Sequence, residues 1–329
     1  MSSMAARVIG LLLAVAIVSG CAYAPIDIDA EHTQAYEATD AGADDLLQRF
    51  APVIVPENTN SEFNRVGRAS LRYDDEQQIE AYIDTSAPTI YAEQRAITLP
   101  SGRQITNLIY RAHFPEVPMP HLTAGNNGGL LFIVTLDANH APLLITTVHT
   151  CGCYVALIPT DHLEQEALPN DWPDGMQSVY GEKLPSQLVV KVDANESMRF
   201  VVVTRDATHR IADVRLASRE QVRNDFRIQA TQLQPMSQLR ALSLPDGVQA
   251  SFFRDTGSRK DYVRNAFKPL ELVFMSWWTF DFSIGMDKDY GAAPSDTATT
   301  FYTSLQPWYR QRSDLENFAE FLAFWGFRL

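Results

Sequence analysis

Short runs of β-branched, leucine and aromatic residues, separated by proline and glycine, fill the chain from residue 53 to residue 216. Runs of this kind are typical of β-strands. Residues 107–114 alternate between two faces, with Tyr110 on one face and Arg111 on the other. Residues 129–136 are almost continuously apolar, as in a strand that is buried on both faces. The pattern therefore predicts extensive β-sheet over this part of the chain.

Two hairpins are predicted within this region. The first joins the apolar run 129–136 to a second strand, residues 143–158, through a turn at 138–141. The second joins 187–192 to 199–204. Strands that are joined by short turns pair antiparallel, so the sheet system should be largely antiparallel.

Helical patterns begin after residue 217. Ser218 is placed to cap a short helix. Ser313 and Glu316 match a capping box, in which each side chain bonds to the other residue's backbone. One apolar face of a helix follows, formed by Leu315, Phe318, Phe321, Leu322 and Trp325. We therefore predict an α+β fold, with a largely antiparallel β-sheet system and helices concentrated in the C-terminal third.

The N-terminal residues form an export signal. Arg7 precedes the apolar run 8–18, and Ser19 and Gly20 lead to Cys21. The run is too short for a comfortable transmembrane helix, which needs about 20 apolar residues. An ordinary cleaved signal peptide is one interpretation of this pattern.

The Val18-Ser19-Gly20-Cys21 ending resembles the lipobox of bacterial lipoproteins. This resemblance implies that Cys21 is the acylated first residue of the mature protein. Ala22 follows where an aspartate would imply retention in the inner membrane, so in a Gram-negative host the resemblance implies an outer-membrane lipoprotein that faces the periplasm.

The leader and the residues that follow it define the expected domain organisation. Residues 1–20 are the signal peptide. Residues 21–43 comprise the acylated cysteine and a flexible tether rich in Ala, Asp, Glu and Thr. Residues 44–329 form the globular domain, and a subdivision near residue 217 is left open.

Composition narrows the range of partners. The chain is 46% hydrophobic and 20% charged, as in a folded protein, and its net charge is −13. A nucleic-acid partner is not expected, because the sequence has no basic cluster. Anionic headgroups repel an acidic domain, so the membrane contact is expected to be made by the lipid anchor alone.

His149, Cys151 and Cys153 are the leading candidates for chemistry. On an extended strand all three side chains point to one face. The chain has three cysteines, so only these two remain after acylation of Cys21. In an oxidising compartment they form a disulfide, ligate a metal or lie buried as thiols. A flat strand separates their Cα atoms by about 6.6 Å, so a disulfide requires the chain to buckle at Gly152.

A zinc site is the metal-binding alternative. His149 and Cys153 lie about 13 Å apart on a flat strand, so one ion needs a ligand from elsewhere. His113 is the favoured external ligand, which makes His149, Cys151 and His113 the candidate zinc set. Other candidate ligands are His140 and His162.

The leading functional hypothesis is an envelope lipoprotein whose domain binds or scaffolds an unidentified ligand. The alternative is an enzyme, in which Cys151 and Cys153 cycle in thiol redox chemistry beside His149, or the zinc set performs hydrolysis. A protein or glycan partner is also considered. Trp277 and Trp278 are expected to face opposite sides of a strand, with one in the core and one able to stack on a sugar.

We predict that Cys21→Ser abolishes acylation, because it removes the thiol that would carry the lipid, and leaves the protein unprocessed or soluble. Membrane fractionation and intact-mass spectrometry test this result. If the variant fractionates normally with membranes and the wild-type protein carries no lipid mass, the lipoprotein interpretation fails.

Overall fold

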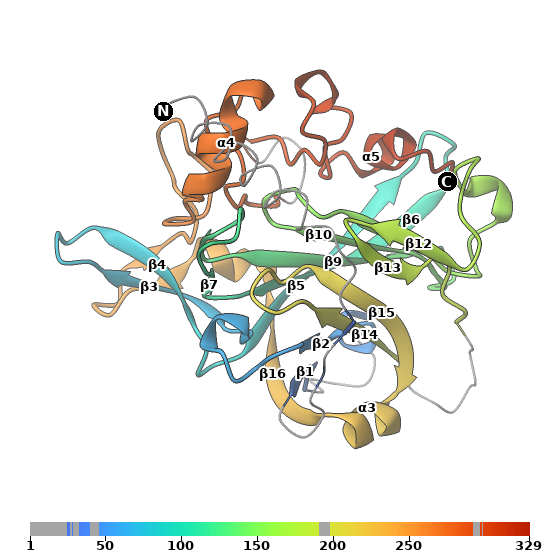
Figure 1. The fold of residues 1–329 in the computed structure, drawn as a ribbon, viewed down its shortest axis with the longest axis horizontal. Helices are drawn as coiled ribbons and strands as arrows, with labels where there is room; N and C mark the ends of the chain where they lie inside the picture. The colour runs from blue at the N-terminus through green and yellow to red at the C-terminus, as the bar shows by residue number, and fades with distance from the viewer. Residues whose placement is uncertain are drawn as a thin grey trace, which may run out of the picture.

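The computed structural model describes residues 25–26, 28, 33–39, 46–190, 198–291, 297 and 299–329 (Figure 1). The predicted signal peptide, Cys21, much of the tether and the turn at 193–196 lie outside the described residues. None of the helices in the described part of the chain is long and apolar enough to cross a bilayer.

A ten-stranded mixed sheet, curved towards a barrel, forms the centre of the molecule (Figure 1). In spatial order its strands are β11 (Ala156–Pro159), β10 (Pro142–His149), β9 (Gly129–Leu136), β6 (Gln104–His113), β5 (Thr89–Thr98), β16 (Arg227–Pro235), β1 (Gln34–Ala38), β2 (Val53–Pro56), β14 (Met198–Thr204) and β15 (Ile211–Ser218). Neighbours are antiparallel except at the β5–β16, β16–β1 and β2–β14 pairings. The predicted antiparallel character is thus confirmed for most of this sheet.

Four hairpins of short strands surround the sheet. They are β3 (Arg68–Tyr73) with β4 (Ile79–Asp84), β7 (Glu116–Val117) with β8 (Gly125–Asn126), β12 (Met176–Val179) with β13 (Glu182–Pro185), and β17 (Leu242–Ser243) with β18 (Gln249–Ala250). The predicted hairpin between 187–192 and 199–204 is wrong, because β14 pairs with β2 and β15 instead.

The described α-helices are α2 (Leu46–Arg49), α3 (Arg219–Asp225), α4 (Pro269–Thr279) and α5 (Phe318–Phe324). Short 3-10 turns are η2 (Glu62–Asn64), η3 (Gln165–Ala167), η4 (Met236–Arg240) and η5 (Pro307–Tyr309). Three of the four α-helices follow residue 218, whereas α2 comes early, so the expected concentration of helices is only partly found.

The two capping predictions have different outcomes. Ser218 caps α3, as expected, and it forms a complete capping box with Gln221. The predicted box at the C-terminal helix is wrong, because α5 begins only at Phe318. The Ser313 hydroxyl instead accepts from the backbone N–H of Ser304 at 3.0 Å, and Glu316 accepts from the N–H of Gly291. Both side chains therefore make tertiary hydrogen bonds and do not cap α5.

The alternating pattern of β6 places two cores on opposite faces of the sheet. Leu108 and Tyr110 join the core on the concave face, which β1, β2, β14 and β15 also line. Ile109 joins the core on the other face, which the C-terminal segment covers. Phe321 of α5 lies fully buried in this second core, as predicted.

We predict that Phe321→Ala lowers the free energy of unfolding by about 3–5 kcal/mol, because a buried phenylalanine is replaced by a cavity. Phe282→Ala is the control, since that side chain is 75% exposed, and it should cost less than about 1 kcal/mol. Denaturant unfolding measures both values. Equal costs for the two variants would show that α5 is peripheral.

Candidate functional site

The strand β10 ends at His149, and the chain then makes a tight turn. The Gly152 N–H donates to the carbonyl of His149 at 2.7 Å, and the His149 N–H donates to the carbonyl of Cys153 at 2.9 Å. Gly152 has φ +93°, and a side chain there would overlap the carbonyl oxygen of Tyr302. The chain returns as β11, so the prediction of one strand over 143–158 is wrong.

This turn brings the two cysteines into a disulfide. The Cys151 and Cys153 Cα atoms are 5.6 Å apart, in place of the 6.6 Å or so of a flat strand. The buckle at Gly152 that a disulfide requires is therefore present. Cys151 is buried and Cys153 is partly exposed. Both sulfurs are committed to each other, so the structure shows no zinc site here.

His149 lies beside the sulfurs as a buried neutral ring. The candidate ligand atoms of His149, Cys151 and Cys153 all lie within 4.8 Å of one another. Nε2 of His149 is 3.0 Å from the carbonyl oxygen of His209. Burial lowers the pKa of His149 to about 4 and the pKa of His209 to about 3. His209 stacks on Phe114 with ring centroids 4.0 Å apart, so the two histidines form an uncharged pair at neutral pH.

The structure does not bring His113 to this group. His113 pairs with Gly129, whereas His149 pairs with the next residue, Leu130. Paired residues share a face and successive residues alternate, so the two histidines point to opposite sides of the sheet. Nε2 of His113 accepts from Arg111 Nε at 2.9 Å, and burial lowers its pKa.

The remaining histidine candidates lie away from the sulfurs. His140 is exposed in the turn between β9 and β10, and His162 is exposed after β11. Neither belongs to the group of neighbouring ligand atoms formed by His149 and the cysteines.

Charged side chains that the sequence did not single out lie directly behind the turn. Lys268 and Asp287 form a fully buried ion pair at 3.2 Å, and the Thr150 hydroxyl donates to Asp287. Nζ of Lys288 donates to the carbonyl of Cys151 at 2.5 Å. Burial lowers the pKa of Lys288 to about 8. Burial also opposes the charge on Lys268, but the combined attraction of nearby acidic groups, chiefly Asp287 and Glu271, outweighs it and raises the Lys268 pKa.

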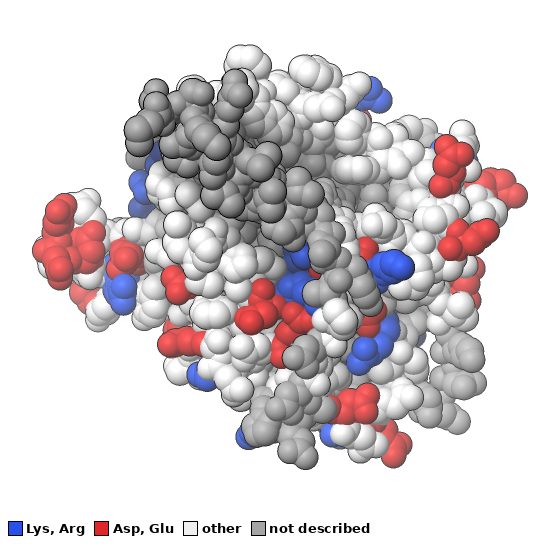
Figure 2. Space-filling model, in the orientation of Figure 1, with Lys and Arg blue, Asp and Glu red and all other residues white. Residues whose placement is uncertain are grey.

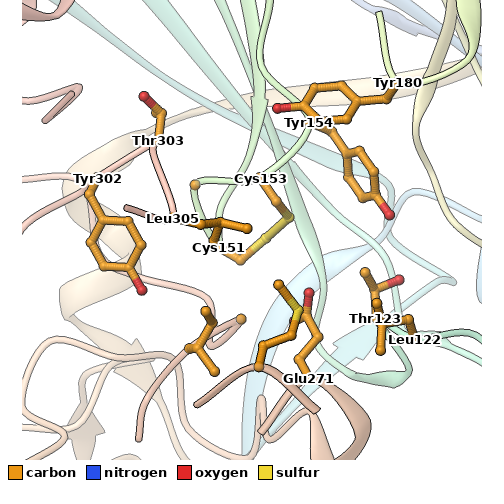
Figure 3. A pocket seen from close by; sticks show the side chains of 14 residues that line it. Leu122, Thr123, Cys151, Cys153, Tyr154, Tyr180, Glu271, Tyr302, Thr303 and Leu305 are labelled. Atoms are coloured by element: carbon orange, nitrogen blue, oxygen red, sulfur yellow. A yellow bond between two sulfur atoms is a disulfide. The ribbon is translucent and has the colours of Figure 1, made fainter. Parts of the chain in front are cut away.

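The disulfide forms one wall of a cavity of about 150 Å³ (Figure 3). Figure 3 shows Tyr302 on one side of the disulfide and Tyr154 and Tyr180 on the other. The lining comes from five separate parts of the chain and comprises Leu122, Thr123, Cys151, Gly152, Cys153, Tyr154, Tyr180, Glu271, Met275, Ile284, Gly285, Tyr302, Thr303 and Leu305.

Glu271 of α4 is the acidic side chain of this lining. Its Oε2 atom is buried and finds no hydrogen-bond partner among the described residues. Burial raises its pKa. Gly285 lies against this carboxyl group, where any larger side chain would overlap it. An unsatisfied buried oxygen is costly and marks a place where a ligand can supply the missing donor.

Comparisons with protein-family models, curated proteins and solved structures find no match to this chain. Function therefore has to be inferred from the geometry of the turn, its disulfide and the cavity beside it.

We predict that acid destabilises the protein between about pH 6.5 and pH 4. The unfolded histidines titrate near 6.5 and the folded ones well below it, so the unfolded chain binds more protons in this window. Stability is therefore retained above about pH 6.5 and lost as the pH falls, by up to about 1.4 kcal/mol per unit for each histidine. Denaturant unfolding at several pH values measures the slope. His209→Gln should reduce it, and an unchanged slope in that variant would contradict the assignment.

Proposed function

We propose that this chain is an envelope lipoprotein, anchored through acylated Cys21 in the outer membrane and facing the periplasm, whose domain binds a small ligand in the cavity beside the disulfide. The observation that carries the binding proposal is the buried, unpartnered oxygen of Glu271 at the cavity wall. A concave, mostly apolar site with few polar groups is the usual form of a small-molecule site.

The lining indicates the chemistry of the ligand. Met275, Ile284 and Leu305 provide apolar contacts, and the carboxyl of Glu271 can accept a hydrogen bond. An apolar cavity of about 150 Å³ is large enough to hold a benzene-sized molecule. The favoured ligand is therefore a small, largely apolar molecule, or the end of a longer one, that carries one hydrogen-bond donor.

The disulfide suits this role in an exported protein. It closes the turn at residues 149–153 in a compartment where such bonds persist. The turn then presents a fixed wall to the ligand, with Gly152 packed against the backbone of Tyr302.

A second candidate function is thiol oxidation. The observation that supports it is the partial exposure of Cys153 at the cavity wall. A thiolate of a substrate dithiol would attack Cys153 Sγ, form a mixed disulfide and release Cys151 as a thiolate. The second substrate thiol would then displace Cys153. The substrate loses two electrons and two protons, which leave Cys151 and Cys153 as thiols.

A zinc site belongs only to this second candidate, in which the disulfide is reduced. Reduction would free two thiolates beside His149, which would supply three ligands and leave one position for water. The oxidised protein offers no thiolate at this place.

Phenol and toluene test the binding proposal, because they have similar size and differ in one hydroxyl donor. We predict that phenol raises the melting temperature of the wild-type protein more than toluene does at equal concentration. Glu271→Met should abolish this difference, while toluene binding reports that the cavity persists. Equal effects of phenol and toluene on the wild-type protein would contradict the proposal.

The second candidate function can be tested on the same purified protein. Incubation with a dithiol peptide, followed by a count of free thiols, shows whether Cys151 and Cys153 accept electrons. Rapid oxidation of the peptide, lost in Cys153→Ser, would favour redox chemistry. Stoichiometric zinc in the reduced protein would favour the metal alternative.

A further inference from the structure

Helix α4 has its polar and apolar faces reversed relative to a helix of a water-soluble domain. Its buried residues include Glu271, Ser276 and Thr279. Its outward face carries Val273, Phe274, Trp277 and Trp278, and Trp277 is 71% exposed. A surface helix in water normally places its apolar side towards the core. The expectation that one of the two tryptophans is core is therefore wrong, because the segment is a helix and both side chains point outward.

This apolar surface continues beyond the helix. Phe280 and Phe282 follow α4 and are 76% and 75% exposed. Arg310 bonds to the carbonyl of Thr279 at the end of the helix, and Trp308, two residues before Arg310 in sequence, is 71% exposed. We call the exposed set the aromatic face, formed by Val273, Phe274, Trp277, Trp278, Phe280, Phe282 and Trp308.

The aromatic face is uncharged within a strongly acidic protein. None of its residues is ionisable, although the chain has a net charge of −13. The neighbouring Asp281 carboxylate accepts from the Tyr302 hydroxyl at 2.5 Å and lies 4.0 Å from Arg310. Figure 2 shows acidic side chains at the left, centre, lower and right parts of the view. Such a face meets no repulsion from lipid headgroups.

The described chain begins at Pro25, four residues after the predicted anchor, and indirect contacts link Pro25 to the cavity that α4 lines. The carbonyl of Pro25 accepts from Arg205, which is paired with Glu182 at 2.6 Å. Glu182 lies two residues after Tyr180, which lines the same cavity as Met275 of α4. Four residues of extended chain span about 14 Å at most, so Cys21 lies within that distance of Pro25.

We propose that the aromatic face docks on the surface of the lipid bilayer, a role that rests on the proposed Cys21 anchor for membrane proximity. Tryptophan and phenylalanine are favoured at the membrane interface, where apolar rings enter the acyl boundary and the indole N–H stays hydrated. A helix that lies in the interface buries an apolar face in this way. The lipid anchor and the face then hold the domain at two points.

Docking also orients the cavity. Met275 and Glu271 line it from the inner side of α4, and Leu122, which is exposed, lines it from the adjoining loop. The cavity therefore lies directly beside the face that contacts lipid. An apolar ligand with one donor would reach Glu271 from the bilayer. The expectation that the lipid anchor alone contacts the membrane is replaced by this proposal.

Tryptophan quenching by brominated lipid tests the docking. The full-length chain is expressed, purified in detergent and reconstituted in phosphatidylcholine vesicles with bromine on the upper acyl chain. We expect tryptophan emission at least twofold lower than in unbrominated vesicles. The Trp277→Ser, Trp278→Ser double variant should lose most of the quenching. Trp172→Phe is the matched control, since Trp172 packs on Phe327 away from α4, and it should retain quenching.

Several outcomes would overturn the docking. Absence of quenching in protein whose Cys21 is acylated by mass spectrometry would show that the domain stands off the membrane. A shift of tryptophan emission with an N-acetylglucosamine trisaccharide and not with vesicles would assign the face to a glycan. A vesicle-free dimer that loses association in Phe280→Ser would assign it to a second copy of the chain.

Failure of the anchor is separable from failure of the docking. If mass spectrometry finds no lipid on Cys21 but the processed protein is still quenched by brominated vesicles, the docking holds and the anchor proposal falls. Because the face is uncharged, quenching should also be unchanged between about 0.05 and 0.5 M salt. Strong loss of quenching at high salt would contradict an apolar contact.

Discussion

Asp287, whose buried charge is compensated by Lys268 of the same C-terminal segment, joins this segment to the turn that follows β10 of the central sheet. Both side chains are almost fully inaccessible, and Asp287 also accepts from the hydroxyl of Thr150 in the turn after β10. Two buried charges are tolerated only while each compensates the other. The next residue, Lys288, reinforces the attachment through its backbone N–H, which donates to the carbonyl of Thr150 at 2.9 Å.

The geometry of the candidate site follows from this attachment. With Lys288 bonded to the carbonyl of Cys151, the turn is held against the C-terminal layer, and Gly152 packs where no side chain fits. The cavity then arises between the disulfide, the tyrosines and the inner side of α4. Because that inner side carries Glu271, the outward side of α4 is left with tryptophan and phenylalanine. Glu271 at the cavity wall and the apolar outer face thus lie on two sides of one helix.

Local pattern was a good guide to individual strands. The alternation of residues 107–114 correctly separated Tyr110 from Ile109 on opposite faces of β6. The cap at Ser218 was also correct, because its hydrogen bonds are local and join it to Gln221. At the C-terminus the same motif failed, because Ser313 and Glu316 found distant backbone partners that no local pattern reveals.

The candidate site was predicted in part. Grouping His149 with the two cysteines was correct, and Gly152 was identified as the place where the chain must buckle. The prediction of His113 as the external zinc ligand was wrong. The side of the sheet that His113 occupies relative to His149 depends on strand register, and a shift of one residue reverses that side. The sequence did not reveal the buried ion pair of Lys268 and Asp287 behind the turn. Both residues lie far from the turn in sequence, and only tertiary packing brings them to it.

The role of the buried pair is tested most directly by a double-mutant cycle on Lys268→Met and Asp287→Leu. Each single variant should lose about 3–5 kcal/mol of unfolding free energy, because it strands the opposite charge in the interior. The double variant should lose much less than the sum, with a coupling of about 2 kcal/mol or more. Costs that add to within about 0.5 kcal/mol would show that the two charges do not depend on each other, and that Lys268 does not hold Asp287 in its place against the turn.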